Sequence, residues 1–208
     1  MTTETLLAFI AATALFAYMP GPALLYTAAQ TIARGKRAGF MAAAGIHLGC
    51  YVHVLAAAFG LSAIFTVVPA LYFALKLAGG FYLIYLGLQM IRTRIAAGPM
   101  PHLPQKTSRR AFADSVLVEV LNPKVAIFFI AFLPQFVSPD AGLPVWAQFL
   151  ILGTFVNCAF TSADIVTVLF ASEIKRRLTR ASRFQDLARW LGGSLLVGLG
   201  LKLATDRS

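Results

Sequence analysis

Long apolar runs alternate with short polar segments along most of this chain. Each run is close to the length of about 20 residues that a helix needs to cross the hydrocarbon core of a bilayer. Proline and glycine mark several of the connections between runs. The predicted spans are Leu6 to Ala29, Phe40 to Phe65, Ala70 to Ile91, Ala111 to Phe136, Val145 to Ser172 and Leu187 to Ala204. The pattern therefore predicts an all-α integral membrane protein with six transmembrane helices.

The composition agrees with this class. The chain has 208 residues, of which 59% are hydrophobic and 12% are charged, whereas soluble domains are about 45–50% apolar and about 25% charged. Disordered chains are poor in apolar residues, so disorder is excluded. Two cysteines are too few for a disulfide-stapled secreted fold. Six helices leave no room for a separate catalytic domain, and we expect a single membrane transport domain over residues 1–208.

The basic residues lie on alternate loops. The net charge is +10, and no Lys or Arg occurs before Arg34 or in the loops after the second and fourth spans. Because basic loops stay in the cytoplasm, both termini are predicted to lie outside a bacterial inner membrane. Anionic lipids are then the expected partner of this charge, rather than nucleic acid. The inner loops contain Arg34, Lys36, Arg37, Arg92, Arg94, Lys106, Arg109, Arg110, Lys175, Arg176, Arg177, Arg180 and Arg183.

The third and sixth spans share one pattern. Each has a basic residue, then Gly-Gly, then Leu, then Leu-Gly-Leu at identical spacing, from Lys76 to Leu88 and from Arg189 to Leu201. The repeating unit is therefore three helices, and because three is odd the second unit must be inverted. Inverted repeats are frequent in secondary transporters. We expect repeat one over about 1–92, a linker over about 93–110 and repeat two over about 111–208.

The first and fourth spans each contain a proline motif near the middle of the membrane. Pro20-Gly21-Pro22 and Asn122-Pro123 both favour a break followed by a new helix, because Asn is a good N-cap and Pro suits the first helical turn. The carbonyls that lose their helical donors would be those of Phe16, Tyr18 and Glu119. In lipid such groups must find another partner or line a cavity.

Charged residues within the spans mark the same region. Helix N-termini attract anions, and Lys124 adds a positive charge beside one of them. Glu119 and Asp164 also lie in apolar runs, where charges are costly and usually serve an ion or substrate path. Glu119 and Asp164 are candidates for proton coupling; Asp164 could equally be a partner for loop arginines.

The second span contains His47, Cys50 and His53 at a spacing of three. These residues could hold a soft metal, but helix packing explains them more simply, and no metal site or cofactor is expected. We find no motif of a hydrolase, metalloprotease or phosphate-binding loop. The sequence therefore predicts that the protein is not an enzyme.

The two proline motifs resemble those of the LysE/RhtB family of amino-acid exporters. The similar stretches are Pro20-Gly21-Pro22, Arg34 to Gly39, Gly45, Gly79-Gly80 to Leu86-Gly87, and Leu121 to Phe136. The resemblance extends over nearly the whole chain. It implies an inner-membrane exporter, driven by the proton gradient, that forms a homodimer. The RhtB branch implies neutral substrates such as homoserine and threonine.

These observations give one hypothesis and two alternatives. The substrate carboxylate would meet the helix starts and Lys124, and its ammonium would meet freed carbonyls and an acid. A cation or metal exporter using His47, Cys50 and Glu119 is one alternative, and a non-transporting membrane scaffold is the other. The predicted substrate-binding residues are Tyr18, Pro20, Gly21, Pro22, Glu119, Asn122, Pro123 and Lys124.

Overall fold

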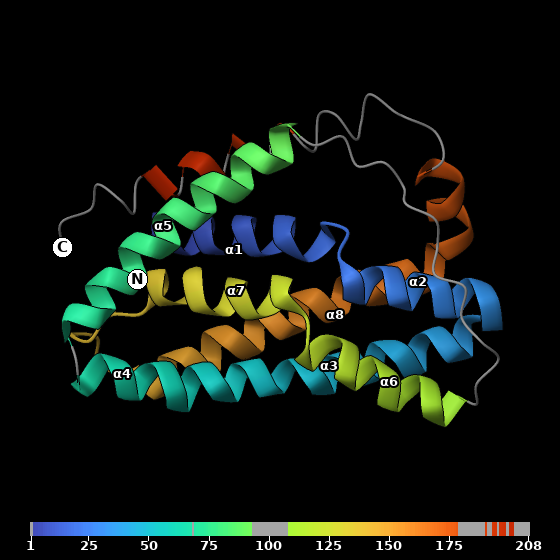
Figure 1. Ribbon diagram of the computed structural model, residues 1–208, viewed down its shortest axis with the longest axis horizontal. Helices are drawn as coiled ribbons and strands as arrows, with labels where there is room; N and C mark the ends of the chain where they lie inside the picture. The colour runs from blue at the N-terminus through green and yellow to red at the C-terminus, as the bar shows by residue number, and fades with distance from the viewer. Residues whose placement is uncertain are drawn as a thin grey trace.

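The computed structural model describes residues 2–67, 69–92, 108–178, 190, 193–194, 196–198 and 200–201. These residues form helices joined by short connections, and the described part of the chain contains no strand (Figure 1). The helices are α1 (Thr3–Tyr18), α2 (Pro22–Arg34), α3 (Lys36–Leu55), the π-helix η1 (Ala56–Leu61), α4 (Ser62–Val67), α5 (Pro69–Arg92), α6 (Ser108–Val120), α7 (Pro123–Ala131), the 3₁₀ helix η2 (Leu133–Phe136) and α8 (Val145–Leu178).

Helical stretches of membrane-spanning length follow the predicted runs. Lys36–Ile64 and Val145–Ala171 are each long and apolar enough to cross a bilayer. Two further pairs of helices are long and apolar enough to cross a bilayer only when each pair is counted together. Each pair is bent, by 47° between α1 and α2 and by 43° between α6 and α7 with η2. The described residues thus contain two candidate spans, or up to four if each bent pair is one. Most of the predicted linker and of the sixth span lies outside the described residues.

Both predicted helix breaks are confirmed. Met19, Pro20 and Gly21 separate α1 from α2, and Pro22 is the first residue of α2. The Asn122 side chain accepts a hydrogen bond from the backbone N–H of Lys124 at 3.1 Å, which caps the start of α7. Each break therefore ends one half-helix and starts another, as the proline chemistry requires.

The half-helices lie in two rows along the long axis of the bundle, α1 with α2 in one row and α7 with α6 in the other (Figure 1). In Figure 1, α1 lies beside α7 at one end, and α2 lies toward the other end with α6. Phenylalanine rings join α1 to α7 and η2: Phe16 stacks on Phe128 of α7 with centroids 4.2 Å apart, and Phe9 meets Phe136 of η2 at 5.0 Å. The two breaks consequently come together in the middle of the bundle.

A single residue turns the chain between α2 and α3. Gly35 has a φ of 83°, a conformation that side chains with a Cβ avoid, and its N–H bonds to the carbonyl of Thr31 at 2.9 Å. This turn lets α2 and α3 pack against each other as neighbours, so the charged segment Arg34 to Arg37 stays at one end of the bundle.

Glycines of α5 face glycines near the end of the chain. A Cβ on Gly200 would collide with the carbonyl of Gly80, and Cβ atoms on Gly87 and Gly193 would each meet the other's carbonyl. Higher numbers on one segment pair with lower numbers on the other, so the two segments pack antiparallel and at close range. These glycines belong to the repeated sequence pattern.

Candidate functional site

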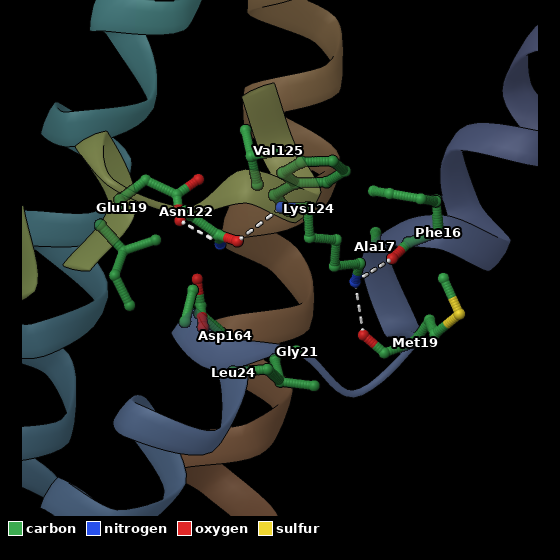
Figure 2. Close-up of a pocket in the computed structure, with 13 residues that line it drawn as sticks. Phe16, Ala17, Met19, Gly21, Leu24, Glu119, Asn122, Lys124, Val125 and Asp164 are labelled. Carbon is green, nitrogen blue, oxygen red and sulfur yellow. Dashed lines mark hydrogen bonds between the residues drawn. The ribbon is translucent and has the colours of Figure 1, made fainter. Parts of the chain in front are cut away.

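A small cavity lies where the two helix breaks meet. The backbone at each break and the facing side of α8 form its walls, and Figure 2 shows side chains from all of these segments converging on it. The lining residues are Phe16, Ala17, Met19, Gly21, Ala23, Leu24, Ile46, Glu119, Asn122, Lys124, Val125, Phe160 and Asp164. Apolar groups thus surround a few polar ones, as is usual for small-molecule sites.

Lys124 reaches from the start of α7 to the end of α1. Its Nζ donates hydrogen bonds to the carbonyl oxygens of Met19 at 2.6 Å and Phe16 at 3.0 Å (Figure 2). The same ammonium lies 4.5 Å from the centre of the Phe16 ring. Pro20 cannot donate to the Phe16 carbonyl, which instead accepts from Lys124 and, at 3.3 Å, from the backbone N–H of Met19. A cation also suits the negative end of a helix.

Glu119 is buried at the other side of the cavity, with 1% of its surface exposed. One carboxylate oxygen, Oε2, accepts a hydrogen bond from the Asn122 side-chain amide at 3.0 Å. The other, Oε1, has no hydrogen-bond partner among the described residues. Its backbone carbonyl, which Pro123 frees, accepts a bond from Nε2 of His53 at 2.9 Å. The Cys50 side chain on α3 also interacts with this carboxylate, and Oε1 is the oxygen left to accept a hydrogen bond from a ligand.

Asp164 of α8 is the second buried acid and is 3% exposed. It lines the same cavity as Glu119 and Lys124. Its Oδ1 also lacks a hydrogen-bond partner within the described ranges. The sequence left two roles open for Asp164, a proton site and a partner for loop arginines, and a position on the cavity wall is what the proton-site hypothesis needs.

The histidines of α3 interact with neighbouring helices. Thr161 gives its hydroxyl proton to the carbonyl of Asn157 at 2.8 Å, so Nδ1 of His47 donates to the Thr161 oxygen at 2.6 Å. His53 is the donor to the Glu119 carbonyl. Where the chain is described, no three His, Cys, Asp or Glu side chains are grouped to hold a metal ion. The helical spacing of these residues serves packing between α3, α6 and α8.

The predicted site residues divide into two groups. Gly21, Glu119, Asn122 and Lys124 line the cavity, together with the predicted proton-coupling residue Asp164. The others, Tyr18, Pro20, Pro22 and Pro123, do not line it. The three prolines set the backbone, and Tyr18 is 50% exposed, with its hydroxyl 3.3 Å from that of Ser162.

Sequence reasoning missed several cavity residues. Ile46 and Phe160 line it from α3 and α8, and Leu24 lines it one turn into α2. Their apolar character is shared by most positions of these helices, so no sequence signal distinguishes them. The role of His53 at the Glu119 carbonyl was also missed, although the proline four residues beyond Glu119 indicated that this carbonyl needed a donor.

The cavity is small in this conformation. Its volume is about 30 Å³, against the about 10–15 Å³ that one water molecule needs in a cavity. An amino acid is several times larger. The cavity must therefore widen before it can hold one.

Close packing of α3 on α6 positions Glu119. A Cβ on Gly49 would lie 2.7 Å from the carbonyl oxygen of Val116 and 3.0 Å from Cβ of Glu119. One turn earlier, a Cβ on Gly45 would overlap Ser115 and the backbone of Phe112. Small residues four apart allow such close helix contacts in membranes.

Gly49→Ala is expected to destabilise the protein by about 1–3 kcal/mol, because the methyl group overpacks this contact. It should also displace Glu119 and reduce function. Thermal unfolding of the purified protein measures the first effect. Gly60→Ala is the matched control, since nothing lies within 4 Å of a Cβ there. Equal unfolding temperatures for the two variants would contradict this packing role.

Comparison with known proteins adds a family match. The family described as LysE type translocator matches residues 14–207. No solved structure matches the chain.

Individual relatives are similar over nearly their full length. A homoserine/homoserine lactone efflux protein of Salmonella typhimurium is 35% identical over 213 residues, covering 100% of this chain and 99% of the relative. A threonine efflux protein of Salmonella typhi is 30% identical over 196 residues, covering 90% and 91%. An uncharacterized membrane protein of Pseudomonas aeruginosa is 34% identical over 199 residues, covering 90% and 88%.

Proposed function

Because this chain belongs to the LysE type translocator family, we propose that it exports neutral amino acids similar to threonine and homoserine. The family assignment supports a multi-pass membrane transporter rather than an enzyme. The substrate class follows the names of the threonine and homoserine efflux relatives. The observation that most supports a transport site is the cavity at the two helix breaks, with buried acids and a lysine on its wall.

We propose that the cavity binds the substrate once it has widened. Glu119 Oε1 and Asp164 Oδ1, the two acceptors without partners, are placed to receive an ammonium group. The start of α2 offers backbone N–H groups to a carboxylate, because Gly21 provides no side-chain cap there. The sequence-based hypothesis placed the ammonium at the freed carbonyls of Tyr18 and Glu119, and the Glu119 carbonyl already accepts a hydrogen bond from His53.

The coupling ion in this proposal is a proton that binds Glu119 or Asp164. A buried carboxylate can be neutral or charged, so it can exchange a proton for a cationic group on the substrate. Both acids line the same cavity, which would make occupation by a proton and by an ammonium mutually exclusive. This arrangement supports exchange of external protons for internal substrate.

The proposed setting is the bacterial inner membrane, with both termini outside and basic loops against anionic lipid. The proposed architecture is six spans in two inverted three-helix repeats, assembled as a homodimer. Antiparallel glycine contacts between α5 and the end of the chain support the inverted arrangement. In these contacts Gly80 meets Gly200, the counterpart of Gly87, and Gly87 meets Gly193, the counterpart of Gly80.

Uptake into inside-out vesicles tests the proposed function. Labelled neutral, basic and acidic amino acids are supplied with and without an imposed proton gradient. Gradient-dependent accumulation of threonine or homoserine is expected in vesicles that contain the protein and not in empty ones. Accumulation of divalent metal instead would favour the metal exporter, and no flux of any solute by folded protein would favour the scaffold.

Pro123→Ala tests the break between α6 and α7. A continuous helix would move Asn122 and Lys124 off the cavity, so gradient-driven uptake is expected to fall by about tenfold or more while the protein stays in the membrane. Pro144→Ala is the control, because Pro144 lies in the connection before α8. Normal uptake by Pro123→Ala at normal abundance would contradict the role of this break.

A further inference from the structure

Around the cavity, two carboxylate oxygens are free to accept hydrogen bonds, whereas the ammonium group of Lys124 already donates to protein carbonyls. Two carboxylate oxygens, Glu119 Oε1 and Asp164 Oδ1, are buried and have no partner among the described residues. They come from α6 and α8, two separate helices, and both residues line the one cavity. A buried charged acceptor without a partner is costly. Such a pair is satisfied by a group that brings several N–H donors and a positive charge.

The cation of the cavity is already engaged. Lys124 donates two hydrogen bonds to the carbonyls of Phe16 and Met19 and lies over the Phe16 ring. Gly21 leaves room for the side chain in this direction, because a Cβ there would lie 2.8 Å from Lys124 Cδ. Figure 2 shows the side chain pointing to the end of α1. A ligand carboxylate that bound Lys124 would have to compete with these contacts.

We propose that the cavity recognises a primary ammonium group through Glu119 and Asp164 together, and that a carboxylate on the ligand is dispensable. The inference rests on the proposed function, since it assumes that this cavity is the transport site. The ligand class is small primary amines: neutral amino acids, and also amino alcohols and amino-acid esters. Lys124 is then a positioning residue that closes the break in the first span.

The charges of the cavity agree with this assignment. Two acids and one base line it, so their ionised forms sum to one negative charge. An amino alcohol brings one positive charge and neutralises the site. A zwitterion brings an additional carboxylate, for which the uncapped start of α2 is the remaining partner. Losing that weak contact costs less than losing the charged contact to both acids.

Two analogues of threonine test the contributions of its amine and its carboxylate separately. Threoninol keeps the ammonium and replaces the carboxylate by an alcohol, whereas 3-hydroxybutanoate keeps the carboxylate and lacks the amine. Binding to the purified protein is measured by calorimetry, beside threonine itself. We expect threoninol to bind within about tenfold of threonine, and 3-hydroxybutanoate to bind at least about 100-fold more weakly. Tight binding of 3-hydroxybutanoate, or none of threoninol, would overturn the inference.

Variants of the two acids locate the binding. Glu119→Gln and Asp164→Asn keep side-chain size, and each is expected to weaken threoninol binding by about 30-fold or more. Asp140→Asn is the control, because Asp140 is exposed on the connection before α8. Unchanged threoninol affinity in both cavity variants would overturn the proposed location.

Lys124→Gln tests the positioning role. Its amide can still donate to the carbonyls, and the affinity ratio of threonine to threoninol is expected to stay as in the unmodified protein. If Lys124→Gln weakens the binding of threonine more than that of threoninol, then Lys124 binds the ligand carboxylate and the inference is wrong. If this variant does not fold, the binding of threoninol and 3-hydroxybutanoate to the unmodified protein decides whether the inference holds.

The outcomes distinguish the inference from the proposed function. Export of threonine by vesicles together with no binding of threoninol leaves the function and rejects the inference. Binding of threoninol with no export of any amino acid supports the inference and rejects the function. If no amine binds the folded protein, the inference is rejected whatever the vesicles transport.

Discussion

Export driven by a proton gradient is expected to be abolished in Asp164→Asn and in Glu119→Gln. Each change keeps the shape of the side chain but removes a carboxylate that is at most 3% exposed and that lines the cavity. The loss removes a ligand for the ammonium group and a site for the coupling proton. We expect initial uptake into inside-out vesicles to fall by about 100-fold, as for loss of a buried charged hydrogen bond.

A second assay separates the two roles of these acids. Exchange of labelled for unlabelled substrate across the membrane needs binding but no net proton movement. The acid whose replacement spares more of this exchange is the one that takes the coupling proton. Asp140→Asn, on an exposed connection, is expected to leave both assays unchanged. Full gradient-driven uptake in either cavity variant would exclude that acid from the mechanism.

Lys124→Met is expected to destabilise the protein by about 3–5 kcal/mol, the usual range when one partner is removed from a buried charged group. The change removes the donor to the Met19 carbonyl and one of two donors to the Phe16 carbonyl, and it leaves two acids without a nearby cation. Thermal unfolding of the protein in detergent measures the effect. Lys36→Met is the control, because Lys36 is exposed at the start of α3.

A double substitution tests the electrostatic part of this effect. Glu119→Gln combined with Lys124→Met removes one charge of each sign from the cavity. If the acids are destabilising without Lys124, the double variant should unfold at a higher temperature than Lys124→Met alone, and the difference gives the coupling between the two residues. An unfolding temperature of Lys124→Met equal to that of Lys36→Met would contradict the role of Lys124.

The sequence was sufficient to place the helix breaks and the polar residues beside them. Proline chemistry is local, so Pro22 and Pro123 could be assigned to helix starts and Asn122 to a cap before any fold was known. The second and fifth predicted spans correspond to long apolar helices for the same reason, since membrane-length hydrophobicity is a property of the segment itself.

The sequence could not predict the hydrogen-bond partners of the polar residues near the breaks. Lys124 bonds to a carbonyl 108 residues away along the chain, and the pairing depends on how α1 packs beside α7. The sequence predicted that Lys124 binds the substrate, because a lysine at a helix start is unfavourable without an anion nearby. The structure shows that the end of another helix provides the negative groups. His53 is a similar case, since the sequence favoured helix packing for it but could not identify the Glu119 carbonyl as its partner.

The small size of the cavity has a consequence for the kinetics of binding. At a volume of about 30 Å³ the cavity is too small for an amino acid in this conformation, and we expect association to follow an opening of the bundle. In a rapid-mixing experiment the observed rate would then stop rising with ligand concentration and level off at the rate of opening. Substitutions that loosen the contact between α1 and α7 would raise that limiting rate, although they touch no part of the ligand.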